Sequence, residues 1–129
     1  MSGTATFNLA NNNQTITNLS GSATNNINLG SAILTINEST AGTFAGVISG
    51  SGNLTVQGTA GNPLTLFGAN TYTGTTTING NTLKISAANN LDTTSGIIFN
   101  NGGILESTSG TYTLTTPVTL TGNGTVMPD

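Results

Sequence analysis

The chain has 129 residues, a formal net charge of −3 and a hydrophobic share of 34%, and only 4% of its residues are charged. Because Lys84 is its one cation, the chain lacks the basic surface that nucleic acids or anionic membranes require. It contains no Cys, His or Arg, which excludes disulfides, Ser-His-Asp and Cys-His catalysis and most zinc sites.

Short alternations of apolar and polar residues recur along the whole chain, with the period of two that is typical of β-strands. Segments rich in Gly, Asn or Ser separate nearly all of them, and Thr suits a pleated surface. No window has apolar residues at helical spacing over several turns, so we predict an all-β chain without significant helix. In chain order the expected strands are residues 7–9, 15–17, 27–29, 34–36, 54–56, 64–66, 77–78, 83–85, 97–99, 104–105, 112–114, 118–120 and 125–126.

Equivalent apolar residues recur about every 20 positions, which predicts a solenoid with about three short strands per coil. Right-handed winding is the default for parallel crossovers, so we expect a right-handed parallel β-helix of about six coils. An antiparallel sandwich is the alternative, but a uniform recurrence has no reason to appear there. The intervals are 20 residues for Leu9–Leu29 and Leu34–Leu54, 19 for Leu64–Leu83 and 21 for Leu83–Ile104.

Residues 46–86 carry the most specific motif, with Gly-Val-Ile-Ser-Gly-Ser-Gly at 46–52 and Gly-Ala-Asn-Thr-Tyr-Thr-Gly at 68–74. This segment resembles the passenger-associated transport repeat of bacterial autotransporters. With the continuation at 96–105 and 117–125, the likeness covers about residues 40–126. The chain departs from the repeat at Asn62-Pro63, which indicates a modified turn, and at Asn81, which is compatible with left-handed geometry.

The resemblance implies a β-helix that is exported to the Gram-negative cell surface or secreted. Its expected partners are then the rest of the passenger and a C-terminal translocator barrel. We expect residues 1–129 to form one β-helical segment of a longer passenger, with 46–86 as its best-matching repeat.

The repeat residues are expected to have structural roles. Asn70 is expected to stack with Asn residues of adjacent coils. Tyr72 is expected either to cover a ladder of apolar side chains or to lie outside, and a structural role is favoured. The expected ladder residues are Leu54, Val56, Leu64, Leu66, Ile78, Leu83 and Ile85, and the glycines expected to turn corners with positive φ are Gly50, Gly52, Gly68, Gly74 and Gly80.

The remaining charged residues do not form an evident reactive group. Asp92 and Glu106 are separated by less than one coil and are expected on different faces, so they do not suit a glycosidase pair. We expect Glu38, Asp92 and Glu106 to be solvated acids and Lys84 to point outward. The sequence therefore predicts no enzyme, no catalytic residue, no cofactor and no metal site.

Two functions remain in competition. The first is a structural stem that supports export and display of the passenger. The second is an adhesin or self-association surface that binds glycans or host proteins through rows of Thr, Asn and Ser. A polysaccharide lyase or hydrolase is a third and weaker hypothesis. Exposed strand edges at the two coil ends also predict end-to-end association.

Overall fold

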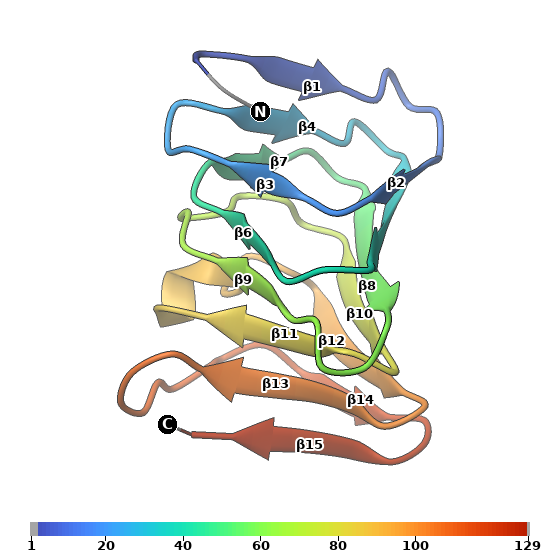
Figure 1. Cartoon of the computed structure of the whole chain (residues 1–129), viewed down its shortest axis with the longest axis vertical. Helices are drawn as coiled ribbons and strands as arrows, with labels where there is room; N and C mark the ends of the chain where they lie inside the picture. The colour runs from blue at the N-terminus through green and yellow to red at the C-terminus, as the bar shows by residue number, and fades with distance from the viewer. Residues whose placement is uncertain (1–2, 129) are drawn as a thin grey trace.

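The computed structural model describes residues 3–128, which form a β-solenoid of about six coils. Three parallel sheets run along the solenoid, with the N-terminal coil at the top of Figure 1 and the C-terminal coil at the bottom. The prediction of an all-β parallel solenoid is therefore confirmed. One 3-10 turn, η1 (Ala88–Asn90), is the single helical element in the described part of the chain.

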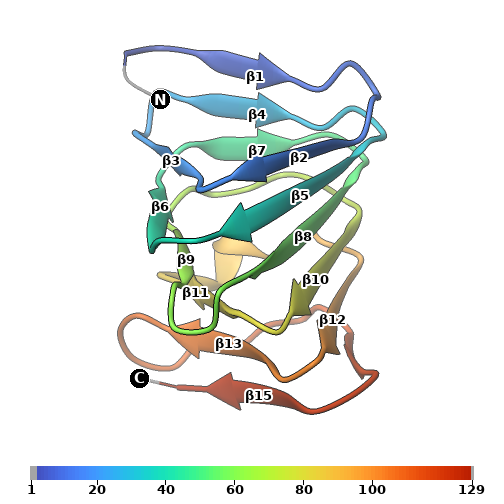
Figure 2. The ribbon, with the colours of Figure 1, turned by 45° about the vertical axis from the view of Figure 1, so that its right-hand side comes forward.

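The first sheet is confined to the N-terminal half and the other two sheets extend along the whole solenoid (Figure 2). The first sheet comprises β1 (Thr6–Asn8), β4 (Asn26–Asn28) and β7 (Val47–Ser49). The second comprises β2 (Gln14–Thr17), β5 (Ile33–Glu38), β8 (Asn53–Gly58), β10 (Thr75–Asn79), β12 (Gly96–Asn100) and β14 (Val118–Leu120). The third comprises β3 (Ser20–Gly21), β6 (Gly42–Phe44), β9 (Leu64–Leu66), β11 (Thr82–Ile85), β13 (Gly103–Ser107) and β15 (Gly124–Met127).

The strand register confirms most of the intervals seen in the sequence. Leu34 pairs with Leu54, and Leu64 pairs with Leu83. The expected partner of Leu83 was wrong, because Leu83 pairs with Leu105 rather than with Ile104. Register partners are 21 residues apart between β10 and β12 but 22 residues apart between β11 and β13, so the inward positions shift by one.

Apolar side chains from all three faces fill the interior of the solenoid. The seven expected ladder residues are all buried, with exposed fractions of 0–2%. They pack in one continuous cluster with further apolar residues from the other coils. The seven residues that the alternating pattern predicted to point inward are thus in the interior.

Asparagine side chains complete the hydrogen bonding at the corners between sheets. The N–H groups of Ile33 and Thr75 donate to Asn13 Oδ1 and Asn53 Oδ1, each at 2.8 Å. Each asparagine lies one coil before the residue that it binds. A corner bends the backbone out of the regular ladder, so a side-chain carbonyl there replaces the missing backbone acceptor. This accounts for much of the asparagine in the sequence.

Some of the expected corner glycines serve a different purpose. Gly50 and Gly80 have positive φ as predicted, but Gly52, Gly68 and Gly74 do not, so that prediction was wrong for these three. At Gly68 an added Cβ would lie 1.8 Å from Gly46 O, and at Gly74 it would lie 2.1 Å from Gly52 O. These positions exclude a side chain because the backbones of adjacent coils approach too closely.

We predict that Gly74→Ala destabilises the protein by about 1–3 kcal/mol or more, because the coils must separate to admit the methyl group. Gly96→Ala is the matched control, since its Cβ would lie at an ordinary 3.6 Å from Pro117 O and its φ is not positive. Urea denaturation followed by circular dichroism would measure both. Equal midpoints for the two variants would show that close approach is not what requires Gly74.

Candidate functional site

The 68–74 motif lies on the first face of the solenoid, where β7 is followed by coils without a regular strand. Asn70 is only 2% exposed. Its Oδ1 accepts the N–H of Ile48 at 2.9 Å, and its Nδ2 donates to Asn90 O at 3.0 Å. Asn70 therefore binds the backbone of both adjacent coils. The expected stack of asparagine side chains is not what the structure shows at this position.

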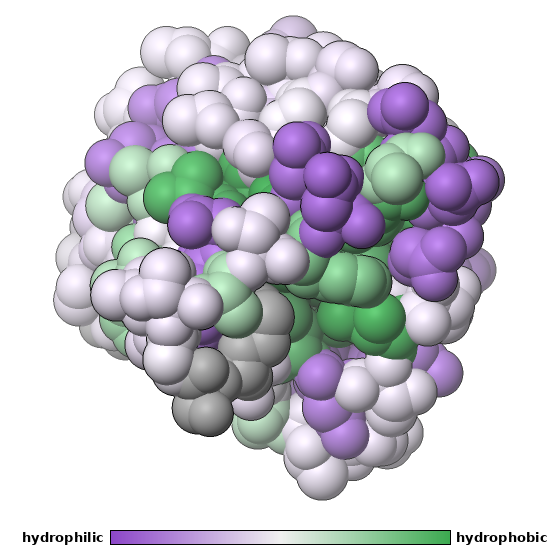
Figure 3. All heavy atoms as spheres, turned by 90° about the horizontal axis from the view of Figure 1, so that it is seen from above, coloured by the Kyte–Doolittle hydropathy of each residue, from purple (hydrophilic) through white to green (hydrophobic). Residues whose placement is uncertain are grey.

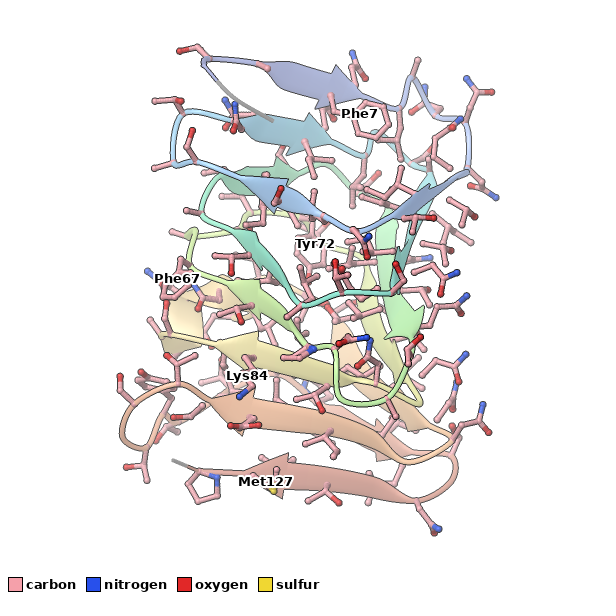
Figure 4. All side chains as sticks on the ribbon, in the orientation of Figure 1. Phe7, Phe67, Tyr72, Lys84 and Met127 are labelled. Carbon is pink, nitrogen blue, oxygen red and sulfur yellow. The ribbon has the colours of Figure 1, made fainter. Side chains whose placement is uncertain are left out.

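Tyr72 is fully buried within the solenoid (Figure 4). Its hydroxyl lies 2.6 Å from Thr76 Oγ1, and the Thr76 hydroxyl donates to Thr94 Oγ1 at 3.1 Å. The Thr94 hydroxyl donates in turn to Gly74 O. Burial raises the pKa of Tyr72 well above its usual value, so the phenol keeps its proton and can donate to Thr76. The result is a chain of hydroxyls that links two successive coils in the interior.

The residues of the expected repeat motif lie on consecutive coils and face the interior or a corner. Leu54, Leu64, Leu66 and Leu83 are fully buried, and Gly50 forms a corner with φ of 106°. Gly52, Gly68 and Gly74 lie against backbone carbonyls of the preceding coil. Their side chains and backbone are thus engaged within the solenoid, and the motif offers no open binding site.

Glu38 is buried, which corrects the expectation of a solvated acid. It is the last residue of β5, where Leu34, Ile36 and Glu38 share the inward side of the strand. The Leu19 N–H donates to Glu38 Oε1 at 3.0 Å, while Oε2 is buried and accepts no hydrogen bond from the described residues. Burial raises the pKa of this carboxyl, and the bond from Leu19 opposes the rise only in part.

We predict that wild-type stability falls as pH rises from about 4.5, because the unfolded chain then loses a proton that native Glu38 retains. The stabilisation is complete below the unfolded pKa and is lost as pH rises through the folded pKa. Glu38→Gln removes this dependence, so its advantage over wild type should grow with pH, by about 1.4 kcal/mol per unit of pKa elevation. Denaturation midpoints between pH 4 and 8 would measure the difference. Glu106→Gln is the control, and a constant difference between wild type and Glu38→Gln would contradict the prediction.

Lys84 and Glu106 form an ion pair that the sequence reasoning missed. They are register partners on β11 and β13, and Lys84 Nζ lies 2.9 Å from Glu106 Oε1. Both side chains are partly exposed, so the pair contributes about 0–1 kcal/mol to stability. The sequence did contain a signal for this pair, because Lys84 and Glu106 have opposite charges and are separated by about the length of one coil. Asp92 is exposed and lies apart from this pair.

Within residues 3–128 the structure shows no group of three acidic residues that could hold a metal ion. The described chain also contains no helix with the length and hydropathy needed to cross a bilayer.

The outer surface of the second sheet carries regular rows of polar side chains. Thr15, Thr35, Thr55 and Thr77 are successive register partners, and a parallel row contains Asn37, Gln57 and Asn79. An open groove of about 430 Å³ follows the second row and is lined by Asn37, Gln57, Gly58, Thr59, Asn79, Gly80 and Asn101. The side chains that line this groove are polar and uncharged.

The two ends of the solenoid expose its apolar interior. Val118, Leu120 and Val126 are register partners of buried ladder residues, yet they are 49%, 59% and 58% exposed. A cavity of about 160 Å³ opens beside Val126. Figure 3 looks onto the N-terminal end, where hydrophobic residues occupy the centre of the face. Both ends therefore present surfaces suited to another coil.

The chain is 42% identical over 78 residues to an autotransporter adhesin, BmaC, of Brucella suis biovar 1 (strain 1330). The match covers 60% of this chain and 2% of that protein. The resemblance to autotransporter passenger repeats is confirmed. No family model matches the chain, and no solved structure gives a significant match.

The similarity to this relative and the solenoid fold agree with the resemblance to autotransporter passenger repeats. The chain spans only about 2% of the length of this relative. The repeat motif is internal to the solenoid, so any contact of this segment with other molecules must use its outer faces or its ends.

Proposed function

We propose that this segment is a β-helical stem of an autotransporter passenger, which supports export and holds other parts of the protein away from the cell. The observation that carries the proposal is the engagement of the motif in contacts between coils. Asn70 binds the coils on both sides, and Tyr72 connects to Thr94 through Thr76. Such contacts hold the coils together as a continuous rod. A rod of this kind suits a spacer rather than a reactive site.

The low charge of the chain supports passage through a narrow translocator at the C-terminal end of the passenger. Only 4% of its residues are charged, so an unfolded chain in the translocator carries few charges. Each coil also buries surface against its neighbours, so folding can propagate coil by coil as the chain emerges.

We predict that removal of one whole coil preserves the stem. Deletion of residues 14–33 joins Asn13 to Leu34, which is the register partner of Gln14, so β5 can take the place of β2. Surface display of the full-length protein should persist, as measured by flow cytometry of an epitope on the N-terminal side. Deletion of residues 14–23 is shorter but leaves the strands out of phase, so display should fall at least several-fold.

A whole-coil deletion that preserved display but abolished adhesion to host surfaces would contradict a purely structural role. It would favour the alternative in which the segment itself is the adhesive surface. The name of the relative, an adhesin, is consistent with that alternative, but the match covers 2% of that protein.

End-to-end association is a further part of the proposal for the isolated 129-residue chain. The C-terminal ladder positions Val118 and Leu120 continue the rows that begin at Gln14 and Ile16, so a second copy can extend the same sheet. The contact joins two different surfaces, which generates filaments rather than closed dimers.

We predict concentration-dependent association by light scattering, and its loss in Leu120→Asp, which places a charge at an inward position of the exposed end. Thr119→Asp is the matched control, since it adds the same charge on the outward side of the same strand. Association should persist in that control. A monodisperse monomer at high concentration would contradict the proposal for the ends and leave the proposed stem unaffected.

A further inference from the structure

The polar groove on the outer corner of the second sheet has a defined arrangement of amide groups. Asn37 pairs in register with Gln57, and Asn79 follows Gln57 on the next coil. Asn101 lies one coil further, beside Asn79. Successive amides are therefore about 4.8 Å apart along the solenoid axis. The groove thus presents a row of uncharged donors and acceptors that crosses four coils.

Each amide in the row donates a hydrogen bond to the amide of the preceding coil, from Asn101 to Asn79 and from Asn79 to Gln57. The N-terminal end of the row makes no such bond. Asn101 Nδ2 donates to Asn79 Oδ1 at 2.6 Å, and Asn79 Nδ2 lies 3.4 Å from Gln57 Oε1. Within the described residues, the Gln57 NH₂ group and the Asn37 amide have no hydrogen-bond partner in the protein. These two groups lie side by side in register and can bind a ligand without first breaking a contact between coils.

The floor and one wall of the groove are held in place. Gly58 leaves the floor bare, since a Cβ there would lie 2.1 Å from Glu38 O. The loop between β8 and β9, which extends toward the following coils in Figure 2, forms the wall beside Thr59. Asn62 Nδ2 in this loop donates to Ser39 O at 2.8 Å, and Asn81 Nδ2 donates to Asn62 O at 3.1 Å. The loop is thus tied to the coils on both sides.

Asn81 also corrects an expectation from the sequence. It is not among the residues with positive φ, so left-handed geometry does not explain its presence. It is buried, and its amide binds both Gln57 O and Asn62 O. Its role is therefore to hold the groove loop against the strand that carries Gln57.

We propose that this groove binds a neutral oligosaccharide that runs parallel to the solenoid axis. Each amide has both a donor and an acceptor, which matches sugar hydroxyls that also donate and accept. The regular spacing of the row suits a polymer with a short repeating unit. This proposal goes beyond the stem function and does not depend on it.

Other ligand classes fit the groove less well. No charged side chain lines it, so an anionic glycan or a nucleic acid finds no cation there. A peptide would need apolar pockets for its side chains or an open strand edge, and the groove lies between strands that are already paired. A neutral saccharide is the class whose groups the lining can satisfy.

The expected affinity of one segment is low, because each exposed hydrogen bond contributes little after competition with water. Binding by a whole cell surface gains from many copies that engage one polymer. A weak but saturable interaction is therefore the signal to seek in the purified chain.

Nuclear magnetic resonance of the ¹⁵N-labelled full chain provides the test, with cellohexaose and maltohexaose as neutral probes and a heparin hexasaccharide as the anionic probe. A neutral probe should shift the side-chain NH₂ signals of Asn37 and Gln57 in a saturable manner. Gln57→Ala should weaken binding by about 2- to 10-fold, the equivalent of one hydrogen bond. Gln14→Ala is the matched control, since Gln14 is exposed at the N-terminal end and outside the groove.

Unchanged backbone spectra in both variants would show that the fold is intact. Three outcomes would overturn the proposal: no shift with either neutral probe, preferential binding of the heparin hexasaccharide, or equal affinity in Gln57→Ala and wild type. Each of these would leave the stem proposal standing, because the coil deletions test the stem through display alone.

Discussion

The parallel backbone ladder between successive coils is the constraint on which the rest of this structure depends. It fixes the coil spacing at about 4.8 Å, so every residue must accommodate a neighbour above and below. Gly68 and Gly74 are required because the backbones there are too close for a Cβ. The same spacing turns inward leucines into continuous apolar rows and places Lys84 against Glu106. Local geometry and long-range packing are therefore set by one repeat distance.

Where the ladder is interrupted, side chains supply the missing bonds. Asn13 and Asn53 act at corners, and Asn70 bridges three coils on the face where β7 has no strand below it. The hydroxyl chain from Tyr72 to Thr94 adds a link between two coils inside the solenoid. An unbonded N–H or carbonyl buried at such places would cost about 1–3 kcal/mol. The asparagines at these places are thus a consequence of the corners and irregular segments in each coil.

The fold class and the ladder residues could be predicted from the sequence. Both depend on the alternation of apolar and polar residues and on the recurrence of apolar residues about every 20 positions, which are visible in the sequence itself. It failed where the offset between register partners changes by one residue from one sheet to the next, as with Ile104 and Leu105. It also failed at Glu38, because strand alternation carries an acid inward there and residue type alone suggests exposure. The groove at Gln57 was not predicted at all, since it arises from a loop and three other coils that meet only in the folded chain.

Inward residues of this segment contact adjacent coils, whereas many outward residues make few contacts within the chain. This difference determines which residues can acquire a new function. Substitutions of the motif alter contacts between coils, so they change the stability of the solenoid. Outward residues such as Asn37 and Gln57 can change with little effect on the ladder, because their amides make few contacts with the rest of the chain. A binding site on the row of amides would therefore be free to diverge on a rod whose interior stays fixed. A solenoid stem and a saccharide-binding surface are in this sense compatible uses of one segment, distinguished by which side of each strand they employ.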